Sequence, residues 1–163
     1  MSHLWIRAAT TEDADAISAL TDAAFGTPEE AQIISRLAAD GDSLASLVAH
    51  NDREIIGHIQ FFKVWVDGED VACGLGPVSA HPDLQRRGIG AGLIRFGLTL
   101  MEGANRSHCF LLGHKDYYPR FGFSADLAAQ FEGPWSGPNF MAKQLIETAV
   151  QSGKLTYPAA FGA

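Results

Sequence analysis

The sequence predicts an α+β fold in which helices cover both faces of a mixed β-sheet. The main observation is the order of apolar periodicities along the chain, which reads strand, two helices, three strands, helix, strand, a short helical stretch and closing strands. The composition agrees, because 47% hydrophobic and 19% charged residues are typical of a globular chain that closes one core. A length of 163 residues fits one domain, so we expect a single domain spanning residues 1–163.

The N-terminal part predicts one strand followed by two helices. Residues 4–8 form a short apolar run that is typical of a strand. Thr10 and Thr11 then offer hydroxyl groups that can cap a helix, and apolar residues recur at helical spacing as far as Phe25. A second helix is expected between the proline and the glycine that bound residues 28–41.

Three strands are expected next, joined by two tight turns. They cover residues 43–50, 54–66 and 71–80. Asn51-Asp52 and Asp67-Gly68 are residue pairs that favour hairpin turns. These strands therefore form a meander, with consecutive strands beside one another in the sheet.

The rest of the chain predicts one long helix and shorter elements. The long helix covers residues 88–103, and a short buried strand covers 109–112. Residues 116–121 indicate one or two helical turns. Residues 139–146 and 155–161 indicate two closing strands.

Charge and composition exclude several classes of protein. The formal net charge of −7 argues against nucleic acid as the main partner, because phosphate binding needs a basic face. The chain lacks a run of roughly 18 apolar residues, so we expect no membrane span. Cys73 and Cys109 are far apart in the sequence and indicate two isolated, reduced thiols in the core of a cytoplasmic protein. Metal-ligand spacing is also absent from the sequence, so we expect no metal site.

The most informative segment is a glycine-rich turn at the start of the long helix. Gly88 and Gly90 have no side chain, so a ligand can approach the backbone closely there. The free N–H groups at a helix start bind anions, and Arg86 and Arg87 add positive charge. The natural ligand of such a turn is a diphosphate. A dinucleotide fingerprint is excluded because its third glycine position holds Leu93, and the P-loop pattern is absent.

This segment resembles the GNAT superfamily of N-acetyltransferases. Residues 85–90, Gln-Arg-Arg-Gly-Ile-Gly, match the family's Q/R-x-x-G-x-G/A signature, and the preceding Val-Ser-Ala-His-Pro at 78–82 is also typical. Residues 118–123, Tyr-Pro-Arg-Phe-Gly-Phe, match the Y-x-x-x-G-F element. The run 112–123 and the closing segment 153–161 are similar to the YhbS-like branch of the family.

The resemblance implies a fold and a cofactor site. It implies a strongly bent, mixed sheet of six to seven strands that splays apart between strands 4 and 5. Gly76-Pro77 supplies a physical reason for the splay, because proline has no N–H to donate to a ladder. The family's acetyl-CoA would contact the strand backbone at one set of residues and the glycine turn at another: Val78, Ser79, Ala80, Gln85, Arg86, Arg87, Gly88, Ile89, Gly90 and Ala91.

The resemblance also assigns one catalytic role and leaves another open. Tyr118 holds the position of the family's general acid, which protonates the departing thiolate. The general base is not determined. His58 and His114 are the two candidates, because histidine is the side chain that titrates near neutral pH. The position of His114 is often an acid in related sequences, so that role is not simply carried over.

We therefore expect an enzyme that moves an acetyl group from acetyl-CoA to a primary amine by direct attack in a ternary complex. The acceptor amine, on a small molecule or a protein, is not identified by the sequence. A non-catalytic acyl-CoA-binding domain and a structural partner module remain alternatives. A homodimer is also expected as a candidate assembly, since closing strands such as 155–161 can pair between subunits.

Overall fold

The computed structural model describes residues 4–85 and 88–162, which divide into two units. The first unit holds Met1–Phe61 and Gly76–Gly97, and the second holds Phe62–Leu75 and Leu98–Ala163. Strands β3 (Ile55–Val66) and β4 (Glu69–Ala80) contribute to both units. The prediction of a single domain spanning the whole chain stays a prediction.

The first unit begins with the predicted strand and two helices. Strand β1 covers Trp5–Ala8, a 3-10 turn covers Thr11–Asp13, and helices α1 and α2 cover Ala14–Phe25 and Glu29–Ala39. Strand β2 follows at Ser43–His50 and pairs antiparallel with β1. These elements lie within a few residues of the positions predicted from the sequence.

A charged cluster fixes the start of the first helical segment. The Asp13 carboxylate accepts a hydrogen bond from the Thr10 N–H at 2.8 Å. It also accepts two from the Arg7 guanidinium, at 2.7 and 3.0 Å. The Arg7 hydrogen bonds, followed by the bond from Thr10, hold the pKa of Asp13 well below its usual value. The helix start is therefore capped where predicted, with the Asp13 carboxylate as its main acceptor.

The described residues form a sheet of eight strands, and its main order is β1-β2-β3-β4-β5-β7. Strand β5 covers His108–Leu112 and β7 covers Phe140–Gln144. Pairing is parallel between β4 and β5 and antiparallel between β5 and β7, so the sheet is mixed, as predicted. The count exceeds the predicted six to seven because Phe131–Glu132 forms a two-residue strand, β6, that pairs with β8 (Gly153–Thr156).

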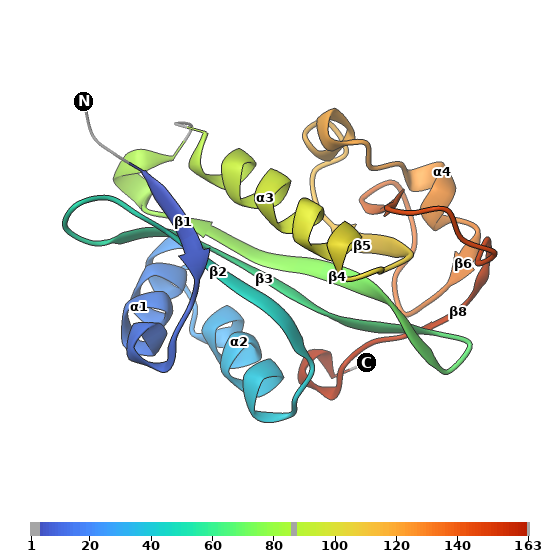
Figure 1. Ribbon diagram of the computed structural model, residues 1–163, viewed down its shortest axis with the longest axis horizontal. Helices are drawn as coiled ribbons and strands as arrows, with labels where there is room; N and C mark the ends of the chain where they lie inside the picture. The colour runs from blue at the N-terminus through green and yellow to red at the C-terminus, as the bar shows by residue number, and fades with distance from the viewer. Residues whose placement is uncertain (1–3, 86–87, 163) are drawn as a thin grey trace. The chain divides into compact units, whose positions relative to one another are not determined.

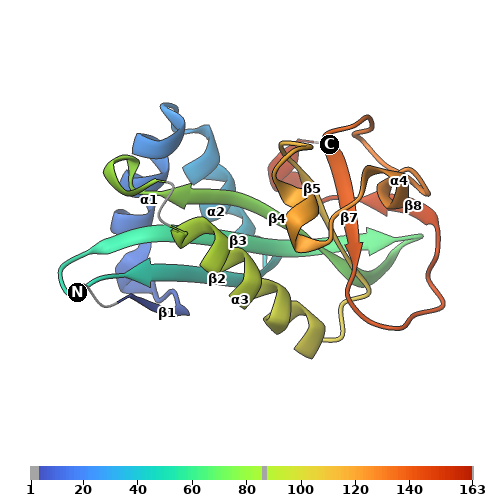
Figure 2. The ribbon, with the colours of Figure 1, turned by 90° about the horizontal axis from the view of Figure 1, so that it is seen from above.

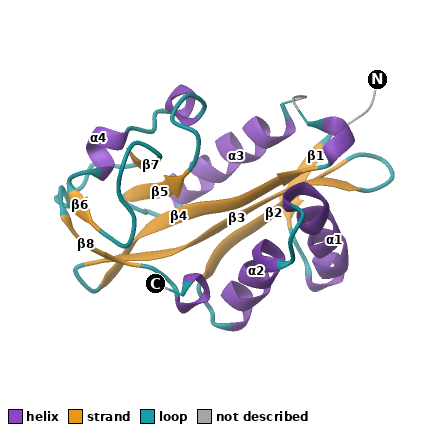
Figure 3. Cartoon of the chain, turned by 180° about the vertical axis from the view of Figure 1, so that it is seen from behind, coloured by secondary structure: helices purple, strands orange, loops and turns teal. Residues whose placement is uncertain are grey.

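In the first unit, helices cover both faces of the sheet. Helices α1 and α2 lie on one face, and the part of α3 (Ile89–Gly103) that belongs to this unit, up to Gly97, lies on the other (Figures 1 and 3). The view from above shows α3 crossing the strands (Figure 2). A Cβ added to Gly97 of α3 would lie 2.1 Å from the Phe61 ring of β3, so this glycine permits the close approach of helix and strand.

The second unit closes around aromatic side chains. Phe110 of β5 packs edge-on against Phe131 and stacks on Phe140, with centroid distances of 5.0 and 5.9 Å. A short helix that was not predicted, α4 (Ala125–Ala128), begins after Ser124, whose hydroxyl accepts a hydrogen bond from the Leu127 N–H at 3.3 Å. Its brevity left no helical periodicity to detect.

The predicted closing strand over 155–161 is wrong for its second half. Strand β8 ends at Thr156, and Ala159–Phe161 forms a 3-10 turn instead. Pro158 precedes this turn, and proline cannot donate to a strand ladder. Within the chain, β8 pairs with β3 and with β6, so both of its edges have partners.

The prediction of two isolated thiols is also wrong. Cys73 and Cys109 are free and buried, as expected, but they lie opposite each other on the parallel strands β4 and β5. Burial and the hydrogen bond with Cys73 raise the pKa of the Cys109 thiol well above its ordinary value. Such thiols pack as core residues.

Within residues 4–85 and 88–162, no helix has both the length and the hydrophobicity needed to cross a bilayer.

Candidate active site

The candidate residues fall into two groups, one in each unit. The first group lies where β4 ends and α3 begins. The parallel pairing of β4 with β5 covers only Cys73 and Gly74, opposite Cys109 and Phe110. Strand β4 continues past Pro77, which has no N–H to donate, as far as Ala80. This early end of the ladder agrees with the splay predicted between strands 4 and 5.

The start of α3 has the features of an anion site. Its first described hydrogen bond runs from the Gly92 N–H to the Gly88 carbonyl at 2.9 Å. Ile89, Gly90 and Ala91 are the first residues of α3, and the first N–H groups of a helix have no partner within the helix itself. The first turn of the helix holds no acidic residue, so the positive end of the helix dipole is not neutralised there.

Glycine at two of these positions keeps the backbone accessible. Gly88 has a φ of +80°, a left-handed conformation that favours glycine. A Cβ on Gly90 would meet only Val78 Cγ1, at 3.9 Å, so this backbone is open and lies beside β4. The buried Ile89 side chain anchors the turn, since its Cγ2 would lie 2.6 Å from a Cβ on Gly57.

The loop between β4 and α3 holds the other predicted cofactor residues. Ser79 is 1% exposed, and its buried hydroxyl has no hydrogen-bond partner among the residues described. The Gln85 amide nitrogen lies 3.5 Å from the Ala80 carbonyl oxygen, at the limit of a hydrogen bond. His81 Nδ1 accepts from the Asp83 N–H at 3.1 Å, which supports a structural role. Arg86 and Arg87 lie outside the described residues.

The second group centres on Tyr118, the first residue of a 3-10 turn that ends at Phe121. The Tyr118 ring lies against the backbone of Gly113, where an added Cβ would be 2.3 Å from Cε2. Phe121 and Phe123 pack around it, with ring centroids at 6.2 and 6.1 Å. Burial, followed by the neighbouring Tyr117 and then Cys109, raises the pKa of Tyr118. The phenol therefore keeps its proton at neutral pH.

The two candidate bases occupy contrasting environments. His114 is exposed, and its carbonyl oxygen accepts hydrogen bonds from the N–H groups of Tyr117 at 3.0 Å and Tyr118 at 3.3 Å. His58 is fully buried, with its Nε2 at 2.7 Å from the Ser46 hydroxyl. Burial lowers the pKa of His58 to about 4, so its imidazole is neutral at physiological pH.

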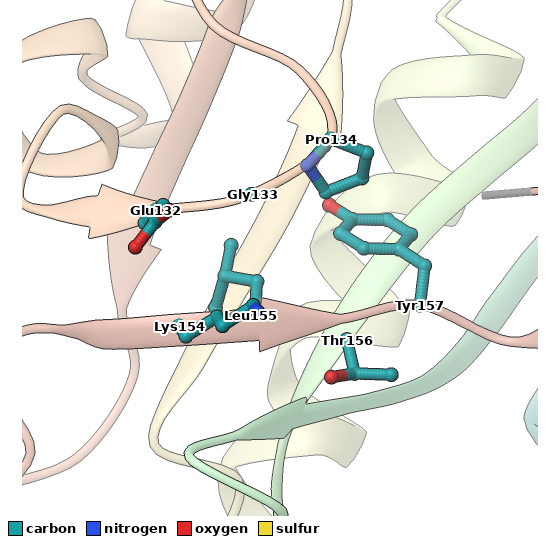
Figure 4. A pocket seen from close by; sticks show the side chains of 7 residues that line it. All are labelled: Glu132, Gly133, Pro134, Lys154, Leu155, Thr156 and Tyr157. Atoms are coloured by element: carbon teal, nitrogen blue, oxygen red, sulfur yellow. The ribbon is translucent and has the colours of Figure 1, made fainter.

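The sequence analysis missed a pocket in the second unit. A hollow of about 340 Å³ lies beside β6 and β8, lined by Glu132, Gly133, Pro134, Lys154, Leu155, Thr156 and Tyr157. The Tyr157 phenol oxygen points toward Pro134 (Figure 4). Burial, followed by the two cysteines, raises the pKa of Tyr157. These residues come from two strands and a loop that are separate in the sequence, so no local motif announces the pocket.

Metal-ligand geometry does not occur in the described part of the chain, where no group of three His, Cys, Asp or Glu residues converges.

Comparison with known proteins identifies the family. Residues 5–125 match the acetyltransferase (GNAT) domain family. The N-acetyltransferase YjhQ of Escherichia coli is 32% identical over 126 residues, which cover 74% of this chain and 70% of YjhQ. The N-acetyltransferase YhbS of the same species is 29% identical over 149 residues, which cover 89% of each chain.

Two solved structures resemble this one over nearly the whole chain. A GNAT family acetyltransferase from Brucella melitensis, in complex with acetyl-CoA, is 36% identical with a TM-score of 0.84, covering 98% of each chain. YhbS from Escherichia coli, in complex with CoA, is 27% identical with a TM-score of 0.92, covering 100% of this chain and 94% of YhbS. The match over most of the chain places this protein in the GNAT family, as an acetyl-CoA-dependent N-acetyltransferase.

Proposed function

We propose that this enzyme transfers the acetyl group of acetyl-CoA to a primary amine by direct attack in a ternary complex. Acetyl-CoA supplies an activated thioester carbonyl, and no residue of the chain needs to carry the acetyl group covalently. The two buried thiols are poor nucleophiles, since a raised pKa keeps Cys109 protonated. GNAT acetyltransferases use an amine acceptor, which supports this class of reaction.

The first unit binds and orients the donor in this proposal. The amides of Ile89, Gly90 and Ala91 bind the diphosphate at the positive end of α3. The backbone of β4 from Val78 to Ala80 holds the pantetheine arm and polarises the thioester carbonyl. The complexes of the two similar structures with acetyl-CoA and CoA support acetyl-CoA as the donor.

Tyr118 is the proposed general acid, and its setting is the observation that carries the mechanism. A thiolate that leaves the thioester needs a proton, and a phenol with a raised pKa holds one throughout the neutral range. The contact with Gly113 fixes the position of the ring. A protonated, immobilised donor is what this step requires.

His114 is the better of the two candidate bases. It is exposed and lies four residues before Tyr118, whereas His58 is fully buried. A base whose pKa is lowered to about 4 is poorly matched to accepting a proton from an amine at neutral pH. We therefore assign His58 a hydrogen-bonding role and His114 the role of proton acceptor.

Substitution of Tyr118 by phenylalanine tests the mechanism. Thiol release from acetyl-CoA is followed with a panel of small amines, amino acids and peptide N-termini. The best acceptor is then used to compare Tyr118→Phe with the neighbouring control Tyr117→Phe. We expect kcat to fall roughly 100-fold or more in the first variant only, with the Kd for acetyl-CoA unchanged. Equal turnover in the two variants would remove Tyr118 from the mechanism. Binding of acetyl-CoA without turnover on any acceptor would refute the transfer itself.

Two further expectations belong to this proposal. A cytoplasmic location is supported by two free cysteines that lie side by side without a disulfide. The predicted homodimer gains no support from β8, because both edges of that strand already pair within the chain. Size-exclusion chromatography with light scattering measures the oligomeric state directly.

A further inference from the structure

The first unit contains a groove that the proposed reaction does not use. It has a volume of about 320 Å³ and lies between α1 and α2, which run along the same face of the sheet (Figures 1 and 3). Its lining comes from the segment before α1, both helices and β2: Ala9, Thr10, Thr11, Ala14, Ile17, Ser18, Ala31, Ile34, Ser35, Ala38 and Ser46. None of these residues has a role in the proposed acetyl transfer.

The lining of this α1–α2 groove is apolar and hydroxyl-bearing. Ile17 and Ala31 are buried, whereas Ala14 and Ala38 lie at the solvent-exposed rim. No lining residue carries an ionisable side chain. A charged ligand would lose hydration in the groove without gaining a counter-charge, so the groove selects against ions. Small side chains on both helices leave room for an apolar body.

Ser46 gives the groove a specific polar contact. Its hydroxyl lies 2.7 Å from Nε2 of His58, which is fully buried behind it. His58 is neutral, so one of its two ring nitrogens carries a proton. Its Nδ1 has no hydrogen-bond partner among the residues described, so no bond at Nδ1 decides which nitrogen that is. The Ser46 hydroxyl therefore has either a donor or an acceptor left for a ligand. A ligand hydroxyl can satisfy both cases, because it donates and accepts.

We infer that the α1–α2 groove is a second binding site, which takes a small neutral molecule with an apolar body and a hydroxyl group. Its volume lies within the range of small-molecule sites, and a mainly apolar lining with one oriented polar contact is their usual chemistry. The apolar part packs between Ile17, Ala31 and Ile34, and the hydroxyl bonds to Ser46.

Titration with 1-hexanol tests this inference on the full chain without acetyl-CoA. Amide chemical shifts are recorded by NMR for the ¹⁵N-labelled protein. Hexanoate and hexyltrimethylammonium serve as anionic and cationic probes with the same alkyl chain. We expect 1-hexanol to shift the amides of Ala31, Ile34 and Ser46 with a Kd of roughly 1–10 mM. The two ions should bind at least about tenfold more weakly, since the groove offers them no counter-charge.

Matched variants locate the binding. Ala38→Leu fills the rim of the groove, and Ala39→Leu adds the same side chain one position further along α2, outside the lining. The first variant should weaken 1-hexanol binding at least about fivefold and the second should not. Ala14→Leu repeats the test from α1. Ser46→Ala should weaken binding about threefold to tenfold by removing the hydrogen bond.

Three outcomes would overturn the inference. They are the absence of saturable shifts with 1-hexanol, equal affinity for hexanoate, or unchanged affinity in both Ala38→Leu and Ala14→Leu. Because the titration contains no acetyl-CoA, its result is independent of whether Tyr118 acts in catalysis.

Discussion

The contact between Gly113 and Tyr118 predicts that one added methyl group on Gly113 lowers the rate of catalysis by displacing the proposed general acid. In Gly113→Ala, the new Cβ would lie 2.3 Å from Cε2 and 2.7 Å from Cδ2 of Tyr118. Carbon atoms in contact settle at about 3.5–4.0 Å, so the ring has to retreat by roughly 1 Å. A displacement of that size at a catalytic group costs about 100-fold in rate. We expect kcat to fall by that factor.

Stability and donor binding should respond differently from turnover. Overpacking of this kind destabilises a protein by about 1–3 kcal/mol, which thermal unfolding detects. The Kd for acetyl-CoA should stay within about twofold of its original value, because Gly113 is not among the residues proposed to hold the cofactor. Gly103→Ala is the control, since a Cβ at Gly103 meets nothing within 4 Å.

A double variant shows whether the loss runs through the tyrosine. If Gly113→Ala acts by displacing Tyr118, adding it to Tyr118→Phe should change kcat very little. A Gly113→Ala enzyme with full turnover would show that the position of the ring does not matter. Fully multiplicative losses in the double variant would show that the glycine acts by another route. Either result would contradict the reasoning above.

Three other predictions follow from contacts in the first unit. Burial lowers the pKa of His58 to about 4 from an ordinary 6.5. Between pH 4 and pH 6.5 the unfolded chain therefore binds more protons than the folded protein, so the free energy of unfolding falls as the pH drops below about 6.5. At pH 4 the loss of unfolding free energy should reach about 3 kcal/mol, as measured by urea unfolding, and it should be absent in His58→Gln. An identical pH profile in the variant would show that the titration of His58 is not its cause. Gly88→Ala should raise the Kd for acetyl-CoA several-fold and destabilise the protein by about 1–2 kcal/mol, because Gly88 has a φ of +80°, which alanine rarely adopts, at the turn proposed to bind the diphosphate; unchanged affinity by calorimetry would contradict the proposed diphosphate site. Asp13→Ala should destabilise the protein by about 1–2 kcal/mol by removing the bonds to Thr10 and Arg7, and a change in unfolding free energy near zero would show that this cap is dispensable.

Sequence reasoning located most of the fold because helices and strands leave local periodicities. The long helix, the meander and the short strand at 108–112 were found within a few residues of their ends. Elements too short to show a hydrophobic periodicity, α4 and β6, were not predicted from the sequence. The strand predicted at 155–161 was wrong beyond Thr156, because Pro158 interrupts the strand pattern after β8. The tyrosine and glycine motifs were found because each depends on a short stretch of backbone.

The sequence alone determined the family, and it led to the proposals for the glycine turn after Gln85 and for Tyr118, since all three rest on residues that are close together in the chain. Only the tertiary structure decided which distant residues meet. Strand pairing brought Cys73 opposite Cys109 and Ser46 to His58, and the fold of the chain laid the Tyr118 ring on Gly113. The physical reason is that a strand's alternating pattern specifies which face each side chain occupies but not which residue of a neighbouring strand lies beside it.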